Sequence, residues 1–238
     1  MNAPAPRPNV RLTVATVDHV RQVSPSFRRV RLRGDFTAFA GSGLHFRFMF
    51  GPPGAPLPTL GPEGLDWPGG AQAWHRPAYT VRALDPGCAW IDVDIFLHDG
   101  GRVTAWTGTL KGGEQVGLTG PGGGGVGTGG WQGLIGDETA LPVVLRMIGA
   151  LPPDARGRAL IRVPDAGDAQ EVALPPGFRL DWITGAPLPE LLEELSPPAG
   201  NRFFFFAGEK AEAERARLWM TARGIEKGES RAAAYWTA

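Results

Sequence analysis

Two arginines flank a tyrosine and a threonine in the segment HRPAYTVR, which begins at residue 75. An unpaired guanidinium is expensive to bury, so Arg76 and Arg82 require either water or an anion beside them. If the segment is a strand, strict alternation places both arginines and Thr80 on one face and Tyr79 on the other. An edge strand with solvated arginines explains the pattern without a ligand. The functional alternative is a bound anion.

A second segment with anion-binding chemistry, HDGGRVTAW, begins at His98. Its residues Gly101 to Thr104 have the form GxxT, and Ala105 and Trp106 begin a predicted short helix. A glycine turn that leads into the first turn of a helix offers unpaired N–H groups and a hydroxyl to an anion, as phosphate-binding loops do. An ordinary turn capped by Thr104 accounts for the same residues without a ligand.

The elements that carry these two segments have the period-two pattern of β-strands. Six such segments lie between residue 9 and about residue 120: VRLTVATVDHV, FRRVRLRG, LHFRFMF, YTVRAL, AWIDVDIFLH and EQVGLTG. Six short strands without a convincing helix predict an antiparallel barrel or sandwich. Residues 51–74 are rich in glycine and proline, which predicts a long irregular surface loop between the third and fourth strands.

Beyond residue 130, strand and helix signals alternate. The strand-like segments WQGLIG, RALIRV, RLDWIT, RFFFFAG and AAAYW are interleaved with helical LPVVLRMIGAL, LPELLEEL and KAEAERARLWMTARG. The run FFFF is apolar without alternation, as expected of a central parallel strand covered on both faces. The pattern predicts an open α/β sheet, whose ligands bind at the carboxyl ends of the strands, here residues 136–139 and 207–209.

A glycine run, GPGGGGVGTGG, joins the two halves at residues 120–130. It contains overlapping GxGxxG matches, but a dinucleotide fingerprint requires glycines that leave a strand and open a helix. This run leads into the apolar segment WQGLIG instead. We therefore interpret it as a flexible connector between two domains.

The composition excludes several classes of protein. The 24 basic and 24 acidic residues give no net charge, so neither a nucleic acid nor a membrane surface is an expected partner. Cys88 is the single cysteine, which excludes an internal disulfide and a cysteine-ligated iron–sulfur cluster, and no metal site is predicted. The sequence contains neither a membrane span nor a signal peptide, which predicts a cytoplasmic protein. The oligomeric state is left open, with a monomer as the expectation.

Together the two candidate segments resemble the flavin-binding signature of the ferredoxin-NADP reductase superfamily, an RxY(S/T) strand followed by a GxxS-type phosphate loop. Within it the chain is most similar to the siderophore-interacting proteins, the ferric-siderophore reductases, through RPAYTVR, DVDIFLH, GRVTAW and GGEQVGLTGP. In the second half GDETALP, AGE and the terminal YW also match. The family's Gly-Pro-Ala is Gly-Arg-Val here, and its terminal Gly-Tyr-Trp-Arg is Ala-Tyr-Trp-Thr.

The resemblance implies a two-domain β + α/β fold. An N-terminal six-stranded antiparallel Greek-key β-barrel that binds FAD would occupy residues 8–122. An open Rossmann-like α/β domain that binds a nicotinamide nucleotide would occupy residues 131–238, after a glycine-rich linker at residues 123–130.

The resemblance also assigns roles to individual residues. Arg76 would neutralise the FAD diphosphate, while Tyr79, stacked on the isoalloxazine, and Thr80, close to flavin N5, are the expected catalytic residues. Gly101 and Thr104 would cradle phosphates together with the residues between them. The full set of expected cofactor-binding residues is Arg76, Ala78, Tyr79, Thr80, Arg82, His98, Gly101, Val103, Thr104, Ala105, Trp106, Asp137, Thr139, Glu209 and Trp236.

Four of these expected contacts, all in the second half, have structural explanations of equal weight. Asp137 or Thr139 caps a predicted helix, and the same helix start would meet the nicotinamide and diphosphate of NAD(P)H. Glu209 precedes the last long helix as a favourable charge and would otherwise lie near the flavin edge. Trp236 covers the flavin ring or packs in the core.

The implied activity is that of an FAD-dependent NAD(P)H oxidoreductase, a ferric-siderophore reductase. It would pass electrons from NAD(P)H or another donor through FAD to an Fe(III) chelate, and release Fe(II) for iron acquisition. The partner is a small-molecule ferric siderophore, and the basic residues that could meet an anionic chelate are Lys111, Lys210, Arg47, Arg102 and Arg231. Two alternatives stay open: a non-catalytic protein that binds a ferric siderophore or another anionic ligand, and a general flavin reductase.

Overall fold

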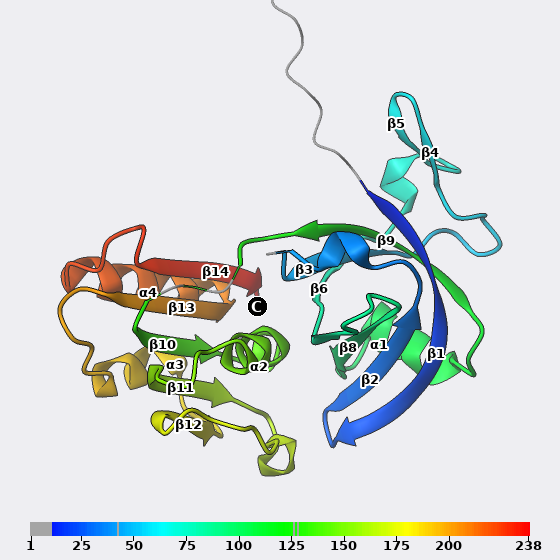
Figure 1. Ribbon diagram of the computed structural model, residues 1–238. Helices are drawn as coiled ribbons and strands as arrows, with labels where there is room; N and C mark the ends of the chain where they lie inside the picture. Colours follow the sequence, from blue (N-terminus) through cyan, green and yellow to red (C-terminus); the bar gives the residue numbers. More distant parts are fainter. Residues whose placement is uncertain (1–10, 42, 126, 128) are drawn as a thin grey trace, which may run out of the picture. The chain divides into compact units, whose positions relative to one another are not determined.

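The polypeptide has a β-rich N-terminal part and an α/β C-terminal part, as the sequence predicts. The computed structural model describes residues 11–41, 43–125, 127 and 129–238. Figure 1 shows the β-rich part in blue to green and the α/β part in green to red. The chain divides into two compact units. The first contains the residues up to Val20, Val30–Val93 and Thr109–Gly124, and the second contains Arg21–Arg29, Asp94–Gly108 and Gly125–Ala238.

Seven strands form an antiparallel sheet in the order β6-β3-β9-β1-β2-β8-β7. They are β1 Leu12–Ser24, β2 Phe27–Arg33, β3 His45–Met49, β6 Ala78–Thr80, β7 Ala83–Leu84, β8 Trp90–Phe96 and β9 Gln115–Gly122. In β2, Val30 and Leu32 are fully buried, and the arginines at 29, 31 and 33 occupy the opposite face. A 3-10 helix, η1 Thr37–Phe39, and one α-helix, α1 Arg102–Thr109, accompany these strands.

The predicted strand YTVRAL is divided into β6 and β7, so the six expected strands are seven. Strand β6 pairs with β3, whereas β7 pairs with β8. Thr80 and Val81 are both buried because the chain passes from one partner strand to the other between them. The expected alternation along the whole segment is therefore wrong: Arg76 is exposed, Thr80 is buried and Arg82 is half-buried.

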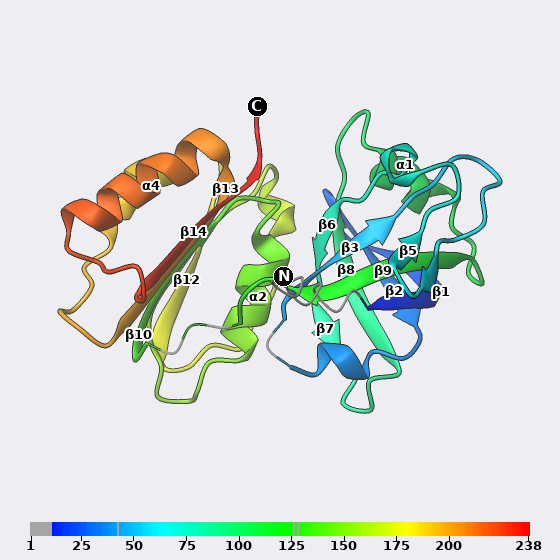
Figure 2. The ribbon, with the colours of Figure 1, turned by 90° about the horizontal axis from the view of Figure 1, so that it is seen from above.

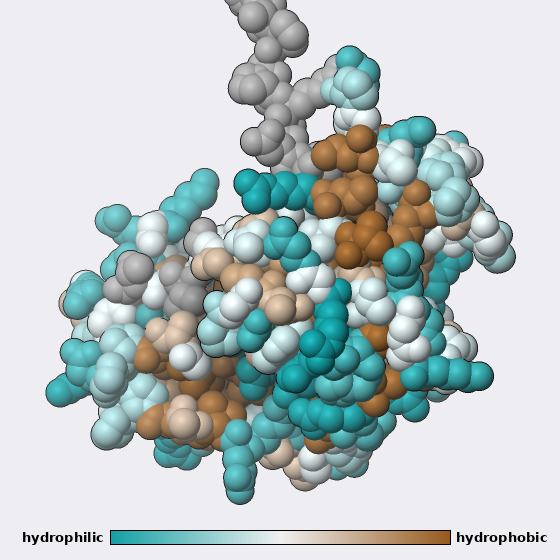
Figure 3. Space-filling model, turned by 45° about the vertical axis from the view of Figure 1, so that its right-hand side comes forward, coloured by the Kyte–Doolittle hydropathy of each residue, from teal (hydrophilic) through white to brown (hydrophobic). Residues whose placement is uncertain are grey.

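The glycine- and proline-rich stretch of residues 51–74 is more regular than the sequence indicates. It contains an antiparallel hairpin, β4 Thr59–Gly61 with β5 Gly64–Asp66, and the 3-10 helix η2 Ala71–Ala73. Trp74 is buried and its Nε1 donates to Pro68 O at 2.9 Å, which fixes the base of the hairpin. Figure 3 shows apolar surface gathered in the region of the hairpin, where the Leu60 side chain is 57% exposed.

The C-terminal part is built on a five-stranded parallel sheet in the order β12-β11-β10-β13-β14. Its strands are β10 Trp131–Gly136, β11 Arg156–Arg162, β12 Gly177–Ile183, β13 Arg202–Glu209 and β14 Ser230–Trp236. The FFFF run lies within β13, between β10 and β14, and all four phenylalanines are buried. The prediction of a parallel strand covered on both faces is confirmed.

Helices cover both faces of this parallel sheet. Figure 2 shows α2 Leu141–Gly149 on one face and α4 Lys210–Ala222 on the other. The short helices α3 Leu188–Leu191 and η4 Leu192–Glu194 share a buried cluster with α4 and with Phe204 and Phe206 of β13. A further 3-10 helix, η3 Ala166–Asp168, follows β11. None of the helices in the described ranges has the length and apolarity needed to cross a membrane.

Gly127 and Gly129, near the end of the glycine run, lie against the parallel sheet. The role of the run as a connector between two domains stays a prediction. A Cβ on Gly127 would lie 2.1 Å from Phe203, and one on Gly129 would lie 2.4 Å from the backbone of Arg202. The buried side chain of Gln132 donates Nε2 hydrogen bonds to the carbonyl oxygens of both glycines, at 2.9 Å and 3.1 Å. The Phe203 ring therefore explains Gly127, and the close approach of the Arg202 backbone explains Gly129, while residues 126 and 128 of the predicted linker lie outside the described residues.

Candidate functional site

Strand β6 carries three of the predicted flavin contacts, Ala78, Tyr79 and Thr80. The half-buried Tyr79 ring lies 5.2 Å from the ring of Phe48, centroid to centroid, and burial raises the pKa of the Tyr79 phenol to about 12. The buried Thr80 places Oγ1 3.2 Å from His45 Nδ1. Strand pairing and side-chain contacts with β3 thus hold Tyr79 as a neutral phenol in a fixed position.

A cavity of about 500 Å³ lies against this strand. Arginines 11, 47 and 76 supply its charged wall, His45, Phe46 and Trp67 supply its aromatic wall, and Pro121 with the glycines at 120, 122 and 123 supplies a third wall. Ala78 and Thr119 complete the lining on the strand side, and Leu65 completes it on the hairpin. All of these residues belong to the first compact unit. The cavity therefore combines positive charge with flat apolar surface.

The arginines of the cavity form no ion pair with any residue that the structure describes. Arg47 Nη1 donates to Arg76 O at 2.9 Å, which ties the two segments together through the main chain. The guanidinium carbon of Arg76 lies 4.9 Å from the ring centroid of Trp67, in cation–π contact. The sequence had marked Arg76 and, as a surface charge, Arg47. It gave no signal for Arg11 or Trp67, which reach the cavity from the start of β1 and from the end of the hairpin.

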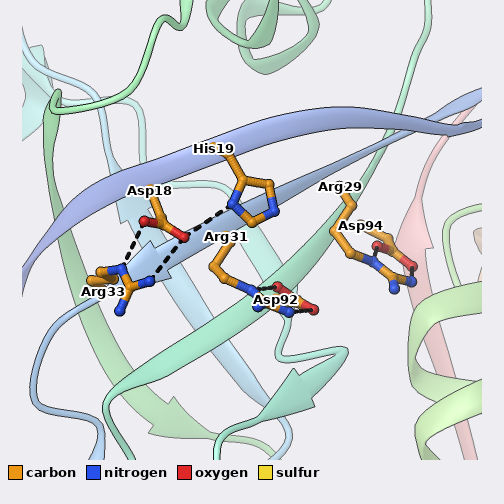
Figure 4. Close-up of polar contacts among 7 residues, drawn as sticks. All are labelled: Asp18, His19, Arg29, Arg31, Arg33, Asp92 and Asp94. Atoms are coloured by element: carbon orange, nitrogen blue, oxygen red, sulfur yellow. Dashed lines mark hydrogen bonds and ion pairs between the residues drawn. The ribbon is translucent and has the colours of Figure 1, made fainter.

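Three other arginines of the β-rich part are neutralised within the chain. Figure 4 shows Arg29, Arg31 and Arg33 of β2 facing Asp94, Asp92 and Asp18 respectively, each through two nitrogens. The Nε···Oδ1 distances are 2.6, 2.8 and 2.7 Å in that order. These bidentate pairs leave no charge for a ligand.

The GxxT segment forms the start of α1, which begins at Arg102 and not at Ala105 as the sequence predicts. The first helical hydrogen bond runs from Ala105 N to Gly101 O at 2.9 Å, so the N–H groups of the three residues in between precede it. Thr104 Oγ1 accepts from His98 N at 3.2 Å. A Cβ on Gly101 would lie 2.7 Å from the His98 ring and 2.9 Å from Thr104 Oγ1, so only glycine fits this turn.

The remaining predicted residues of α1 show mixed exposure. Val103 is 5% exposed and packs inward, so it can contribute only its backbone to a ligand. Ala105 is exposed and Trp106 is half-buried. Arg82 is absent from the lining of the cavity, and its N–H donates to Asp92 O at 2.8 Å. The structure thus separates Arg82 from the cavity that Arg76 and Ala78 line.

The four predicted residues of the α/β part lie at the carboxyl ends of β10, β13 and β14, where their polar groups bind to the chain itself. Asp137 Oδ1 accepts from Thr139 N at 2.9 Å and from Thr139 Oγ1 at 2.6 Å, which closes the turn before α2. The Glu209 carboxylate accepts from the N–H groups of Ala211 and Glu212 and caps α4. Trp236 Nε1 donates to Asp137 Oδ2 at 2.7 Å. The capping prediction is therefore confirmed for Glu209, whereas the N-cap of α2 is Ala140 and not Asp137 or Thr139.

The residues present fit a flavin dinucleotide. A diphosphate requires a cation, which the guanidinium of Arg76 in the first unit can provide. In the second unit, the N–H groups at the start of α1 are of the kind that bind phosphate. An isoalloxazine ring requires a flat aromatic contact, which the half-buried Tyr79 can provide. Gly101 packs closely against His98 and Thr104. Because it has no side chain, it adds no atoms beside the N–H groups at the start of α1.

Comparisons with known proteins agree with this chemistry. A family model described as "Siderophore-interacting FAD-binding domain" matches residues 16–125, and one described as "Siderophore-interacting protein" matches residues 130–238. The NADPH-dependent ferric-chelate reductase of Escherichia coli (strain K12) is 27% identical over 247 residues, which cover 98% of this chain and 95% of that protein. The ferric vibriobactin reductase ViuB of Vibrio cholerae is 28% identical over 215 residues, 81% of this chain and 78% of that protein.

A solved structure also matches over nearly the whole length. The siderophore-interacting protein SipS from Aeromonas hydrophila has a TM-score of 0.81 and 29% sequence identity. The match covers 97% of this chain and 100% of that chain.

Proposed function

Because the chain belongs to the siderophore-interacting protein family, we propose that it is an FAD-dependent ferric-siderophore reductase. It takes electrons from NAD(P)H, passes them through FAD to an Fe(III) chelate and releases Fe(II) for iron acquisition. We place this reaction in the cytoplasm, where NAD(P)H is regenerated. The observation that carries the proposal is the cavity lined by Arg11, Arg47 and Arg76, whose charges no described carboxylate neutralises.

The chemistry of the substrate explains why such a cavity is needed. Fe(III) is a hard cation that chelators hold with anionic oxygen donors, so many ferric chelates carry net negative charge. The guanidinium groups of Arg11 and Arg47, which remain when Arg76 binds the FAD diphosphate, attract such an anion, and the attraction is strongest at low ionic strength. Fe(II) binds hard oxygen donors less tightly, so reduction releases the metal. The aromatic walls of the cavity suit the apolar parts of a chelate.

The cofactor contacts form the second part of the proposal. In the first unit, Arg76 binds the diphosphate, and Tyr79 and Thr80 contact the flavin ring. In the second unit, Gly101 and Thr104 bind phosphate through the first turn of α1. Bound FAD supplies the redox chemistry that these side chains lack, the exchange between a two-electron donor and a one-electron acceptor. The protein itself binds and orients the cofactor and the substrate, and it excludes water from them.

The finer architecture follows the same reasoning. If β6 and β7 are counted as one bent strand that pairs with β3 at one end and with β8 at the other, the antiparallel sheet closes into a six-stranded Greek-key barrel. We propose domain boundaries at residues 8–122 and 131–238, with the glycine-rich segment 123–130 between them.

An anaerobic assay with a ferrous-specific chromogenic chelator tests the function. We expect FAD-loaded protein to oxidise NADPH or NADH beyond the one equivalent that reduces its own FAD only when a ferric chelate is present, and to form coloured Fe(II) complex in proportion. Arg47→Met should raise the KM for an anionic ferric chelate by about tenfold, since one charge contact is worth about 1–2 kcal/mol. Arg215→Met, which removes an exposed arginine from α4, is the matched control and should leave the KM unchanged.

Two outcomes of the assay contradict the proposal. Nucleotide oxidation that proceeds equally with and without the chelate when free riboflavin is supplied as the acceptor would identify a general flavin reductase. Chelate binding without any Fe(II) formation would identify a non-catalytic binding protein.

A further inference from the structure

Three motifs that lie far apart in the sequence meet at the carboxyl edge of the parallel sheet. GDET follows β10, AGE ends β13 and YW ends β14, whose tip Figure 1 shows beside the C-terminus. The register places Gly136 beside Ala207 and Glu209 beside Trp236. Ligands of open α/β sheets bind at this edge.

The carboxylate of Asp137 connects the three motifs. Asp137 is 0% exposed. Its Oδ1 accepts from Thr139 and from Ala140 N, which orders the turn before α2. Its Oδ2 points to the opposite side, accepts from Trp236 Nε1 at 2.7 Å and lies 3.9 Å from Arg162 Nη2. One buried carboxylate therefore binds both the start of α2 and the end of β14.

The AGE motif of β13 leaves space for the hydrogen bond between Asp137 and Trp236. A Cβ on Gly208 would lie 2.8 Å from Asp137 Oδ2 and 3.1 Å from its Cγ. The glycine of AGE lets the carboxylate pass β13 and reach the strand beyond it. A larger residue at position 208 would displace the carboxylate from the indole.

The hydrogen bond to Trp236 exceeds what the turn before α2 requires. Burial of a carboxylate is unfavourable unless its oxygens are hydrogen-bonded, and this turn engages only Oδ1. The other oxygen holds the side chain of the third residue from the C-terminus, which remains 38% exposed. A charge-assisted hydrogen bond restricts the indole to one orientation. The result is a fixed, partly exposed aromatic ring at the ligand-binding edge of the sheet.

We propose that Asp137 is a positioning residue, and that its hydrogen bond fixes the Trp236 indole as an aromatic contact surface for the nicotinamide nucleotide. This inference rests on the proposed function, because it assigns residues to the binding of its electron donor. Asp137 itself touches no nucleotide and acts through Trp236. The aromatic ring and not the indole N–H contacts the ligand, since the N–H is engaged by Oδ2.

Two substitutions break the hydrogen bond from opposite sides. Trp236→Phe keeps an aromatic ring and removes the N–H. Asp137→Asn keeps an oxygen for the α2 turn and presents an amide NH₂, which cannot accept, to the indole. Trp236→Phe alters a partly exposed residue near the C-terminus, so it should fold even if Asp137→Asn does not. The FAD content of each purified variant and its thermal midpoint report on folding.

Calorimetric titration of the FAD-loaded protein with NADP⁺ and with NAD⁺ measures donor binding without turnover. Each single variant should weaken binding of the preferred nucleotide by roughly three- to tenfold, the range of one aromatic contact. The double variant should bind the nucleotide no less tightly than the single variant with the lower affinity, because both changes remove the same contact. In turnover, KM for the donor should rise by the same factor while kcat with a saturating donor is unchanged.

The contrary results are distinct. Unchanged nucleotide affinity in Trp236→Phe, with or without a lower thermal midpoint, would show that the hydrogen bond only anchors the C-terminal strand, and would overturn this inference alone. Wild-type protein that binds neither nucleotide would overturn both this inference and the donor assigned in the proposed function.

Discussion

Arginine is used in two contrasting ways within the β-rich part. Arg29, Arg31 and Arg33 alternate along one strand, and each meets an aspartate of a neighbouring strand in a bidentate pair. Arg11, Arg47 and Arg76 converge from separate segments on one cavity, and among the described residues they meet no carboxylate. The first set holds the sheet together. The second set leaves its charge for a ligand.

The difference between the two sets shows which arginines indicate a ligand-binding site. Residues two apart on a strand share a face, so three arginines on β2 need acidic partners across the sheet, and β1 and β8 supply them. Around the cavity, the residue directly opposite Arg47 on β9 is Thr119, which carries no charge. An arginine cluster without a cross-strand carboxylate is therefore the signature of the site.

The largest effect is expected where a paired arginine is removed next to a buried partner. Arg29→Met leaves the Asp94 side chain, which is 0% exposed, without its guanidinium. Loss of one member of a buried pair should lower the free energy of unfolding by about 3 kcal/mol. Urea denaturation measures this. The double variant Arg29→Met/Asp94→Leu should recover most of the loss, and no recovery would show that the pair is not the cause.

A carboxylate placed in the cavity should pair with a cavity arginine, as the aspartates pair with the arginines of β2. Thr119→Glu puts an acid across from Arg47 on the same face of the sheet. We expect the KM for an anionic ferric chelate to rise by about tenfold, since the new acid competes for the guanidinium. Thr119→Gln has the same size without the charge and should change the KM less than twofold. Equal effects of the two variants would assign the loss to bulk and not to charge.

The smallest effect is expected at Arg33–Asp18, the most exposed of the three arginine–aspartate pairs of β2. The hydrogen bond from Arg33 lowers the pKa of Asp18 below its ordinary value of 3.8, against a weaker opposing effect of burial. A lowered pKa in the folded state contributes stability that is present above pH 3.8 and is lost as the pH falls through the folded pKa. Asp18→Asn should therefore remove a small part of the acid sensitivity. Urea midpoints measured from neutral pH to below the folded pKa check this, and an unchanged acid profile would show that the pair contributes nothing.

The sequence predicts the local elements well because their signals are local. The run of phenylalanines in β13 and the strand–helix alternation after residue 130 specify the parallel sheet without knowledge of any distant contact. Residue type and spacing also predict anion binding by Arg76 and by the Gly101 turn. Glycine density is less informative. The run before β10 indicates flexibility, although a side chain at Gly127 would clash with the Phe203 ring and one at Gly129 with the Arg202 backbone.

The parts that could not be predicted depend on which strands become neighbours. Arg11 and Arg47 reach one cavity only because β1, β9 and β3 are adjacent in the sheet. Asp137 and Trp236 are 99 positions apart, and their hydrogen bond follows from the order β10-β13-β14. The local contacts of Asp137 Oδ1 with Thr139 and Ala140 are within reach of a sequence pattern, but no local pattern shows where Oδ2 is directed.

The central claim is that the chain uses bound FAD to deliver electrons to a ferric chelate. Visible absorbance of the purified protein, followed through one anaerobic cycle, tests it most directly. We expect the flavin absorbance to be bleached by a stoichiometric amount of NAD(P)H or dithionite and to return when an anionic ferric chelate is added, with one Fe(II) formed for each electron. Protein that stays colourless after incubation with FAD, or flavin that remains bleached in the presence of the chelate, would contradict the account.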